Sequence, residues 1–121
     1  PEDPSPHPRL RGAFPRVLGH SSRDLGLFPL HTAAPKMTGL SAARFDLKQR
    51  GEIREGHWAD LVLFDSVTIR DVVDFNDPQR AAEGIDGVWV NGVLSYSEGQ
   101  ANGKRAGRFL AREGDLRAGF L

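Results

Sequence analysis

The sequence predicts an α+β protein in which a helical part comes first and an antiparallel strand part follows. Three observations carry this prediction. Apolar residues recur at helical spacing before about residue 50. A continuous apolar run fills residues 61–64, and two β-rich runs flank Asn91-Gly92, the dipeptide typical of a two-residue hairpin turn. Because the periodicity changes near residue 50, the chain divides there.

Length and composition limit the classes of protein that the chain can form. Its 121 residues suffice for one modest domain but not for a complete (β/α)8 barrel, which needs about 200 residues or more. The 16 basic residues balance 16 acidic ones, so neither nucleic acid nor an anionic membrane surface is expected as a partner. No apolar run approaches the roughly 20 residues of a membrane span. The absence of cysteine removes disulfides and thiolate zinc ligands and fits a reducing compartment, so we expect a cytoplasmic protein.

An irregular loop is expected over residues 1–14, because the prolines near the start of the chain remove amide donors and favour extended geometry. A helix should follow from Pro15, which suits a first helical position, with an apolar stripe through Val17 and Leu18. Gly26 is suited to end this helix.

A second helix is predicted from about Pro29 to Thr38, where apolar residues recur at helical spacing. Pro35 is unfavourable inside this helix by about 3 kcal/mol, so a kink or a late start is expected. A short third helix through Phe45 should begin at Ser41, because its hydroxyl can accept a hydrogen bond from an exposed amide of the first turn.

Strands are predicted after residue 50. The run over residues 59–65 is continuously apolar at its centre, which is typical of a strand covered on both faces. Asn91-Gly92 should form a type I′ turn with Val90 and Val93 on either side. The stretch between these strands is expected to be an excursion with turns. The last fifteen residues are expected to form a tail that is poorly ordered or needs a partner to dock on.

The residues offer no self-sufficient active site. The four histidines form neither an H-x-H pair nor an i, i+4 pair on a helix, and isolated histidines usually pack or hydrogen-bond. Neither a G-x-S-x-G motif nor a G-x-G-x-x-G motif between a strand and a helix occurs. Trp58, Trp89 and Tyr96 are interpreted as core or cross-strand aromatics rather than as a stacking platform. The crowded stretch PHPRLRGAFPRVLG, residues 6–19, is therefore the segment of most functional interest.

Three segments stand out together: HPRLRGAFPRVLGH, KMTGLSAARFDLKQRGEIREGHWADLVLFD and GIDGVWVNGVL. In this order, from about Pro1 to Phe109, they resemble the C-terminal portion of the N-acyl-D-amino-acid deacylases, or D-aminoacylases, of the amidohydrolase superfamily. The resemblance implies a zinc-dependent (β/α)8 barrel with a small β-sandwich domain assembled from both chain ends. Residues 1–48 would then close the barrel, residues 49–110 would contribute antiparallel strands to the sandwich, and residues 111–121 would form a tail.

The resemblance also implies roles at the start of the chain. Arg9 aligns with an arginine associated with the α-carboxylate of the substrate, and a guanidinium matches that group with two parallel N–H donors. A solvated loop arginine is the alternative. The general-base aspartate is expected just upstream of Pro1, and the family's zinc ligands match nothing here. The chain itself is therefore expected to contain no catalytic residue and to bind no zinc. Arg11 and Pro35 depart from the family pattern.

The resemblance thus implies the tail end of a longer zinc hydrolase that cleaves an N-acyl-D-amino acid to a carboxylate and a free D-amino acid. The alternative is a non-catalytic β-sandwich or association module of another amidohydrolase, similar to dihydroorotases or hydantoinases. The expected partners are the N-acyl-D-amino acid substrate, the missing N-terminal segment of the same protein and, for the separate chain, a second copy. The side chain of the substrate is not specified by these residues.

Overall fold

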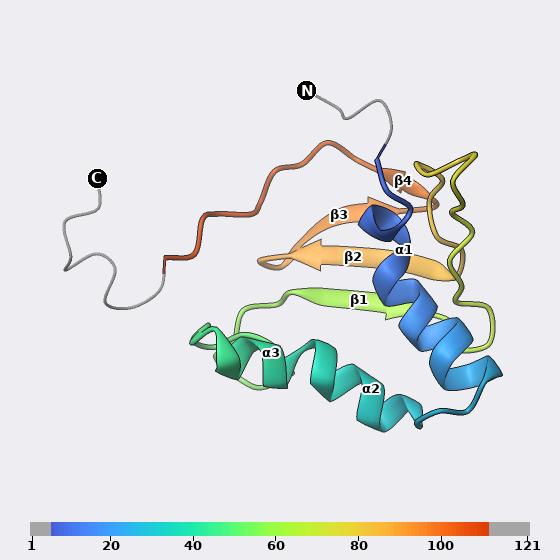
Figure 1. Cartoon of the computed structure of the whole chain (residues 1–121). Coiled ribbons are helices and arrows are strands. Elements are labelled where there is room, and N and C mark those ends of the chain that lie inside the picture. Colours follow the sequence, from blue (N-terminus) through green and yellow to red (C-terminus); the bar gives the residue numbers. More distant parts are fainter. Residues whose placement is uncertain (1–5, 112–121) are drawn as a thin grey trace.

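Helices form the first half of the molecule and an antiparallel sheet forms the second half (Figure 1). The computed structural model describes residues 6–111. The α+β class is confirmed, and no helix in this part of the chain is long and apolar enough to cross a membrane. The elements are α1 (Arg9–Arg16), the π-helix η1 (Val17–Asp24), α2 (Leu30–Met37), α3 (Gly39–Arg44), β1 (Leu61–Phe64), β2 (Ile85–Val90), β3 (Val93–Ser97) and β4 (Gln100–Ala101).

The four strands form an antiparallel meander in the order β1-β2-β3-β4. The predicted hairpin is confirmed, because Val90 pairs with Val93 across the two-residue turn. Asn91 has a φ of 49° and Gly92 a φ of 79°, which are the positive values that a type I′ turn requires. The predicted strand within residues 59–65 is also present, as β1. The short strand β4 was not predicted.

The first helix begins earlier than the proline pattern predicts. The loop expected up to residue 14 is wrong from Arg9 onwards, where α1 starts; residues 6–8 are not helical, and residues 1–5 lie outside the described part. Pro8 already has a helical φ of −50° at the N-cap, and the Nδ1 of His7 accepts the N–H of Arg9 at 3.1 Å. Pro15 is therefore inside α1 rather than at a helix start, and the hydrogen bonding becomes π-helical two residues later. The positive φ of Gly26, 60°, follows the helix as predicted.

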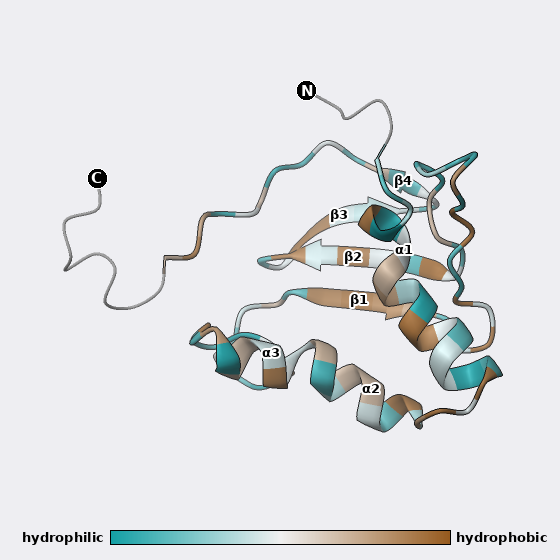
Figure 2. Cartoon of the chain, in the orientation of Figure 1, coloured by the Kyte–Doolittle hydropathy of each residue, from teal (hydrophilic) through white to brown (hydrophobic). Residues whose placement is uncertain are grey.

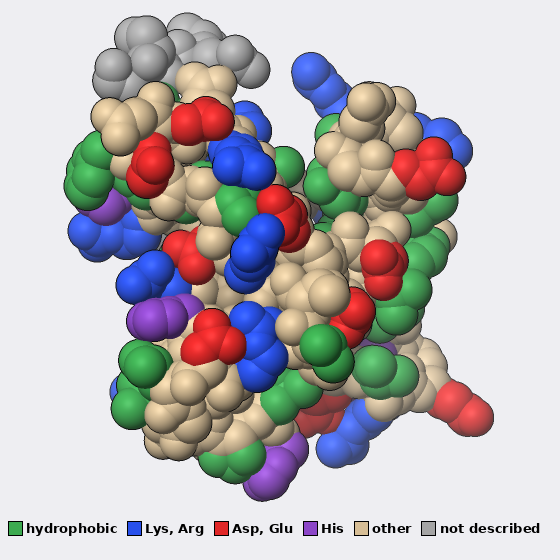
Figure 3. All heavy atoms as spheres, turned by 90° about the vertical axis from the view of Figure 1, so that its right-hand side faces the viewer, with side chains coloured by type: hydrophobic (Ala, Val, Ile, Leu, Met, Phe, Trp, Pro, Cys, Tyr) green, Lys and Arg blue, Asp and Glu red, His purple; other side chains and the backbone are tan. Residues whose placement is uncertain are grey.

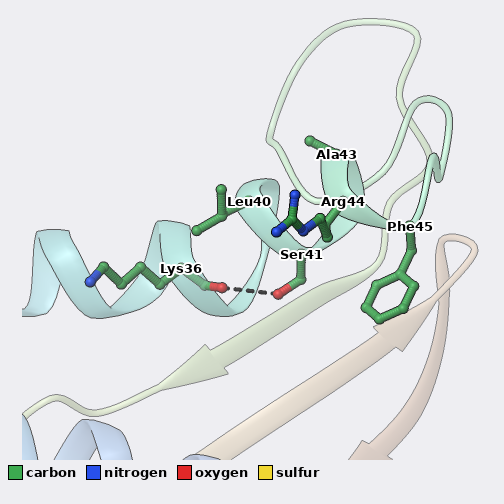
Figure 4. Close-up of a pocket in the computed structure, with 6 residues that line it drawn as sticks. All are labelled: Lys36, Leu40, Ser41, Ala43, Arg44 and Phe45. Atoms are coloured by element: carbon green, nitrogen blue, oxygen red, sulfur yellow. Dashed lines mark hydrogen bonds between the residues drawn. The ribbon is translucent and has the colours of Figure 1, made fainter.

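The second and third helices follow one another along the β1 side of the sheet (Figure 1). The late start considered for the helix with Pro35 is wrong, since α2 begins at Leu30 and runs through the proline. Helical geometry is interrupted instead at Thr38, with φ −122° and ψ −89°. The predicted cap at Ser41 is also wrong. Because α3 begins two residues earlier, the Ser41 hydroxyl donates to the carbonyl oxygen of Lys36 at 2.9 Å (Figure 4).

Strand β1 lies at an edge of the sheet and is hydrophobic along its length (Figure 2). Its apolar side chains are nevertheless largely exposed. The prediction of a strand covered on both faces is therefore wrong within residues 6–111. Besides prolines, the buried apolar side chains in this part of the chain are those of Ala33, Ala42 and Ile69, of which Ile69 is the large one. The helices and the sheet thus cover little of one another's apolar surface.

Ile69 joins the helical part to the sheet part. Its side chain is 1% exposed, and it lies in the long connection between β1 and β2. A Cβ atom at Gly19 in η1 would overlap the carbonyl oxygen of Ile69, so only glycine lets the two backbones approach this closely. On the other side, Gly84 has a φ of 81°, and a Cβ there would lie 2.5 Å from the backbone nitrogen of Ile69. The guanidinium of Arg23 donates to the same Ile69 carbonyl at 2.7 Å.

Replacing Gly19 with alanine tests this contact. We expect Gly19→Ala to lower the free energy of unfolding by about 2 kcal/mol, because the new methyl group meets backbone that cannot move aside as a side chain can. Gly107→Ala is the matched control, since its Cβ would meet Val90 at an ordinary 3.7 Å. Urea denaturation of the full-length protein measures both variants. Equal stability of the two would contradict the role of Gly19.

Candidate functional site

The candidate site is the amino end of α1, where the structure places Arg9. This arginine is the first residue of the helix, and it is exposed. Among the residues that the structure describes, its side chain has no hydrogen-bond or ion-pair partner. The prediction that Arg9 reads a carboxylate is not tested by these contacts. Within residues 6–111, no contact competes with a ligand for its guanidinium.

Two contacts hold this helix end against the loop of residues 74–79. The His7 ring packs edge-to-face on Phe75, with 5.3 Å between ring centroids and 82° between ring planes. The Arg11 guanidinium donates to the carbonyl oxygen of Gln79 at 2.5 Å. Since His7 also accepts the backbone N–H of Arg9, the backbone at the start of the helix is fixed from both sides.

The charge distribution at this helix end favours an anion. The first turn of α1 contains Arg9 and Arg11 but no acidic residue. Cations are unfavourable near a helix N-terminus, where the aligned peptide dipoles create a partial positive charge. The first backbone N–H groups of α1 already donate to His7 and Pro8, so an anion there would be bound by the guanidinium rather than by these groups. A carboxylate is therefore a suitable ligand for this position.

The loop of residues 74–79 belongs to the connection between β1 and β2, whose earlier residues also make polar contacts. The N–H of Val67 donates to the Asp65 carboxylate at 2.8 Å and, with the Thr68 hydroxyl, holds the pKa of Asp65 below its usual value. Further along, Arg16 of α1 pairs with Asp71 at 3.1 Å. Figure 3 shows basic and acidic side chains intermixed on the face that carries this loop. The loop thus connects the sheet to the helix that bears the candidate site.

The described residues do not fit a catalytic zinc ion. The histidines are dispersed, with His7 beside the loop, His20 in η1, His31 in α2 and His57 in a turn before β1. Within residues 6–111, no three side chains of the histidine, cysteine, aspartate and glutamate types come together as ligands. Zinc catalysis commonly uses three protein ligands and an open position for water. No metal-dependent step is therefore assigned to the described side chains.

A second polar cluster, which the sequence did not reveal, lies at the β2–β3 turn. Arg50 has a side chain only 9% exposed, forms an ion pair with Asp60, and donates to Oδ1 of Asn91 at 2.8 Å. Two guanidinium groups lie over the Trp58 ring, that of Arg50 at 5.2 Å and that of Arg108 at 4.2 Å from the ring centroid. Trp58 is thus neither a core nor a cross-strand aromatic. The cluster ties residues 50–60, the hairpin and the segment after β4 together.

Comparison with solved structures identifies the class of fold. The chain superposes on a crystal structure of D-aminoacylase with a TM-score of 0.88 and 54% identity, over 93% of this chain and 24% of that one. A structure of N-acyl-D-glutamate deacylase from Bordetella bronchiseptica, solved with zinc and a phosphonate mimic of the tetrahedral intermediate, matches with a TM-score of 0.76 and 42% identity. That match covers 83% of this chain and 21% of the other. The described fold is therefore that of one portion of a deacylase.

The family follows from the sequence match. Residues 1–96 match the model of the amidohydrolase family, so the chain belongs to that family. D-aminoacylase of Alcaligenes xylosoxydans xylosoxydans is 56% identical over 93% of this chain and 23% of its own length. N-acyl-D-aspartate deacylase of the same organism is 44% identical over 92% of this chain and 22% of its own length. The chain thus spans about a quarter of the length of these relatives.

Proposed function

We propose that this chain is part of a zinc-dependent hydrolase that cleaves the amide bond of N-acyl-D-amino acids, releasing a carboxylate and a free D-amino acid. The observation that carries the proposal is the 56% identity to D-aminoacylase over 93% of the chain. The alternative, a module of a dihydroorotase-like or hydantoinase-like protein, has less support, because the second relative is also a deacylase. A cytoplasmic location stays a prediction.

In this proposal the reaction is divided between this chain and the rest of the polypeptide. The metal, its ligands and the general-base aspartate come from the rest, since residues 6–111 do not bring together a set of metal ligands. Arg9 binds the α-carboxylate of the substrate through its paired N–H groups. The support for this role is its place at the first residue of α1 and the absence of a competing partner among the described residues.

We further propose that α1, η1, α2 and α3 close the barrel and that the sheet completes a β-sandwich with strands from the rest of the polypeptide. Support comes from apolar surface that the described residues leave open. Leu40 is 61% exposed and Phe45 is 68% exposed, beside a hollow of about 590 Å³ on α2 and α3 (Figure 4). Edge strand β1 is exposed as well. For the separate chain, self-association through the same surfaces is the alternative.

Turnover by the full-length protein tests the proposed function. Loaded with zinc, it should hydrolyse N-acetyl-D-amino acids, should leave the L-enantiomers largely uncleaved, and should lose activity with a chelator that zinc reverses. The separate 121-residue chain should show no zinc-dependent turnover. A panel of acidic and apolar D-substrates would reveal the preferred side chain. Failure of the zinc-loaded protein on the whole panel would contradict the proposal.

The role of Arg9 is tested by Arg9→Lys in the full-length protein. We expect kcat/KM for substrates with a free α-carboxylate to fall by about thirtyfold, roughly 2 kcal/mol, because a bidentate contact becomes a point charge. An analogue with an amide in place of the carboxylate should be affected far less. Arg54→Lys, an exposed arginine paired with Glu52, is the control variant. Equal losses on the two substrates would show that Arg9 does not bind the carboxylate.

The covering of α3 is tested by placing a charge on its exposed apolar residues. Leu40→Asp and Phe45→Asp should each destabilise the full-length protein by about 3 kcal/mol or more, because the carboxylate would be buried without a partner. Lys104→Asp introduces the same group at an exposed position after β4 and should have little effect. Thermal unfolding measures all three. Unchanged unfolding temperatures for Leu40→Asp and Phe45→Asp would mean that this surface remains open to solvent.

A further inference from the structure

The chain contains two Asn-Gly dipeptides, Asn91-Gly92 and Asn102-Gly103, and both glycines have a positive φ of 79°. Asparagine before glycine can lose its side-chain amide without an enzyme. The backbone nitrogen of the glycine attacks Cγ of the asparagine, a C–N bond closes a five-membered succinimide, and ammonia leaves with Nδ2. Water then opens the ring at either carbonyl, giving aspartate or isoaspartate. Glycine allows this because no Cβ obstructs the approach. Whether the reaction occurs depends on how the folded chain holds the asparagine carboxamide and the backbone nitrogen of the glycine.

At the β2–β3 turn, both reacting groups are held apart by other partners. Oδ1 of Asn91 accepts from Arg50 at 2.8 Å, and its Nδ2 donates to the carbonyl oxygen of Ala106 at 2.7 Å. These partners are distant in the sequence, so tertiary contacts hold both polar atoms of the side-chain amide. The attacking nitrogen of Gly92 is also engaged, since its N–H donates to the carbonyl oxygen of Ala59 at 2.9 Å. All three hydrogen bonds must break before the ring can close.

At the second dipeptide, the side chain folds back over its own backbone. Oδ1 of Asn102 accepts the N–H of Lys104, two residues along, at 3.0 Å. Its Nδ2 donates to the carbonyl oxygen of Leu94 at 2.7 Å, which is the one long-range restraint on the amide. Among residues 6–111, the N–H of Gly103 donates to no partner. The nucleophile is therefore free, and the carboxamide lies beside the peptide that attacks it.

We propose that Asn102 is a site of spontaneous deamidation and that Asn91, in the same dipeptide context, is protected by the fold. The reaction has a structural consequence. Loss of Nδ2 removes the donor to Leu94 and leaves a carboxylate facing a carbonyl oxygen. Isoaspartate adds a carbon to the main chain just before the segment that supplies Ala106 to Asn91 and Arg108 to Trp58. Deamidation at Asn102 thus loosens the contacts between this segment and the hairpin turn.

The two sites are compared within one molecule. The full-length protein is incubated at mildly alkaline pH, either native or in urea, and peptides with each dipeptide are quantified by mass spectrometry. In the native protein, Asn102 should deamidate about fivefold faster than Asn91, since the hydrogen bond of the Gly92 N–H is one more to be broken and is worth roughly a factor of five. In urea the two rates should converge. Similar native rates, a faster reaction at Asn91, or no native reaction at Asn102 would each overturn the proposal.

A substitution separates deamidation from other ageing reactions. Asn102→Gln keeps one donor and one acceptor but would have to close a six-membered ring, so the product at this position should disappear while Asn91 is unaffected. During incubation, the tryptophan fluorescence of the wild-type protein should change as Arg108 leaves Trp58, and that of Asn102→Gln should stay constant. Identical fluorescence changes in the two proteins would exclude the proposed loosening of the segment after β4.

Discussion

The close approach of Ile69 to two glycines is the contact on which the rest of the structure depends. Gly19 brings the helical part against the Ile69 backbone, and Gly84, at a positive φ, brings the start of β2 against the same residue. Few other apolar side chains in the described part are fully buried. Because so little apolar surface is buried between the helices and the sheet, the backbone contacts of Ile69 determine how the helices lie relative to the sheet.

The same contact positions the candidate site. The segment that begins with Ile69 continues as the loop that packs on α1, first through Asp71 and Arg16 and then through Phe75 and His7. Arg9 therefore owes its position to residues more than sixty places later in the chain. A change near Ile69 would move the helix start, although no residue there would touch a ligand of Arg9.

Local chemistry explains which parts of this fold could be predicted from the sequence. Asn91-Gly92 satisfies the positive φ of its turn by itself, and Gly26 ends its helix in the same way, so both predictions are confirmed. The helix start was mispredicted because a run of prolines favours extended geometry, whereas Pro8 has a helical φ and ψ and His7, which packs on the remote Phe75, accepts the N–H of Arg9. The exposure of β1 was missed because an apolar run predicts that a strand is buried but does not identify the residues that would pack on it.

At the candidate site, too, neighbouring residues in the sequence predict only part of what the structure shows. The residues alone would leave Arg9 as one of several exposed arginines, and only the family resemblance distinguished it. The structure adds that its side chain is uncommitted among the described residues and that it stands at the positive end of a helix. Phe75, which packs on the neighbouring His7, belongs to the long β1–β2 connection, whose turn-rich sequence indicates an excursion but not what it contacts. In the proposed enzyme, binding of the carboxylate therefore depends on a connection between strands of the small domain, so that the two domains would contribute jointly to one substrate contact.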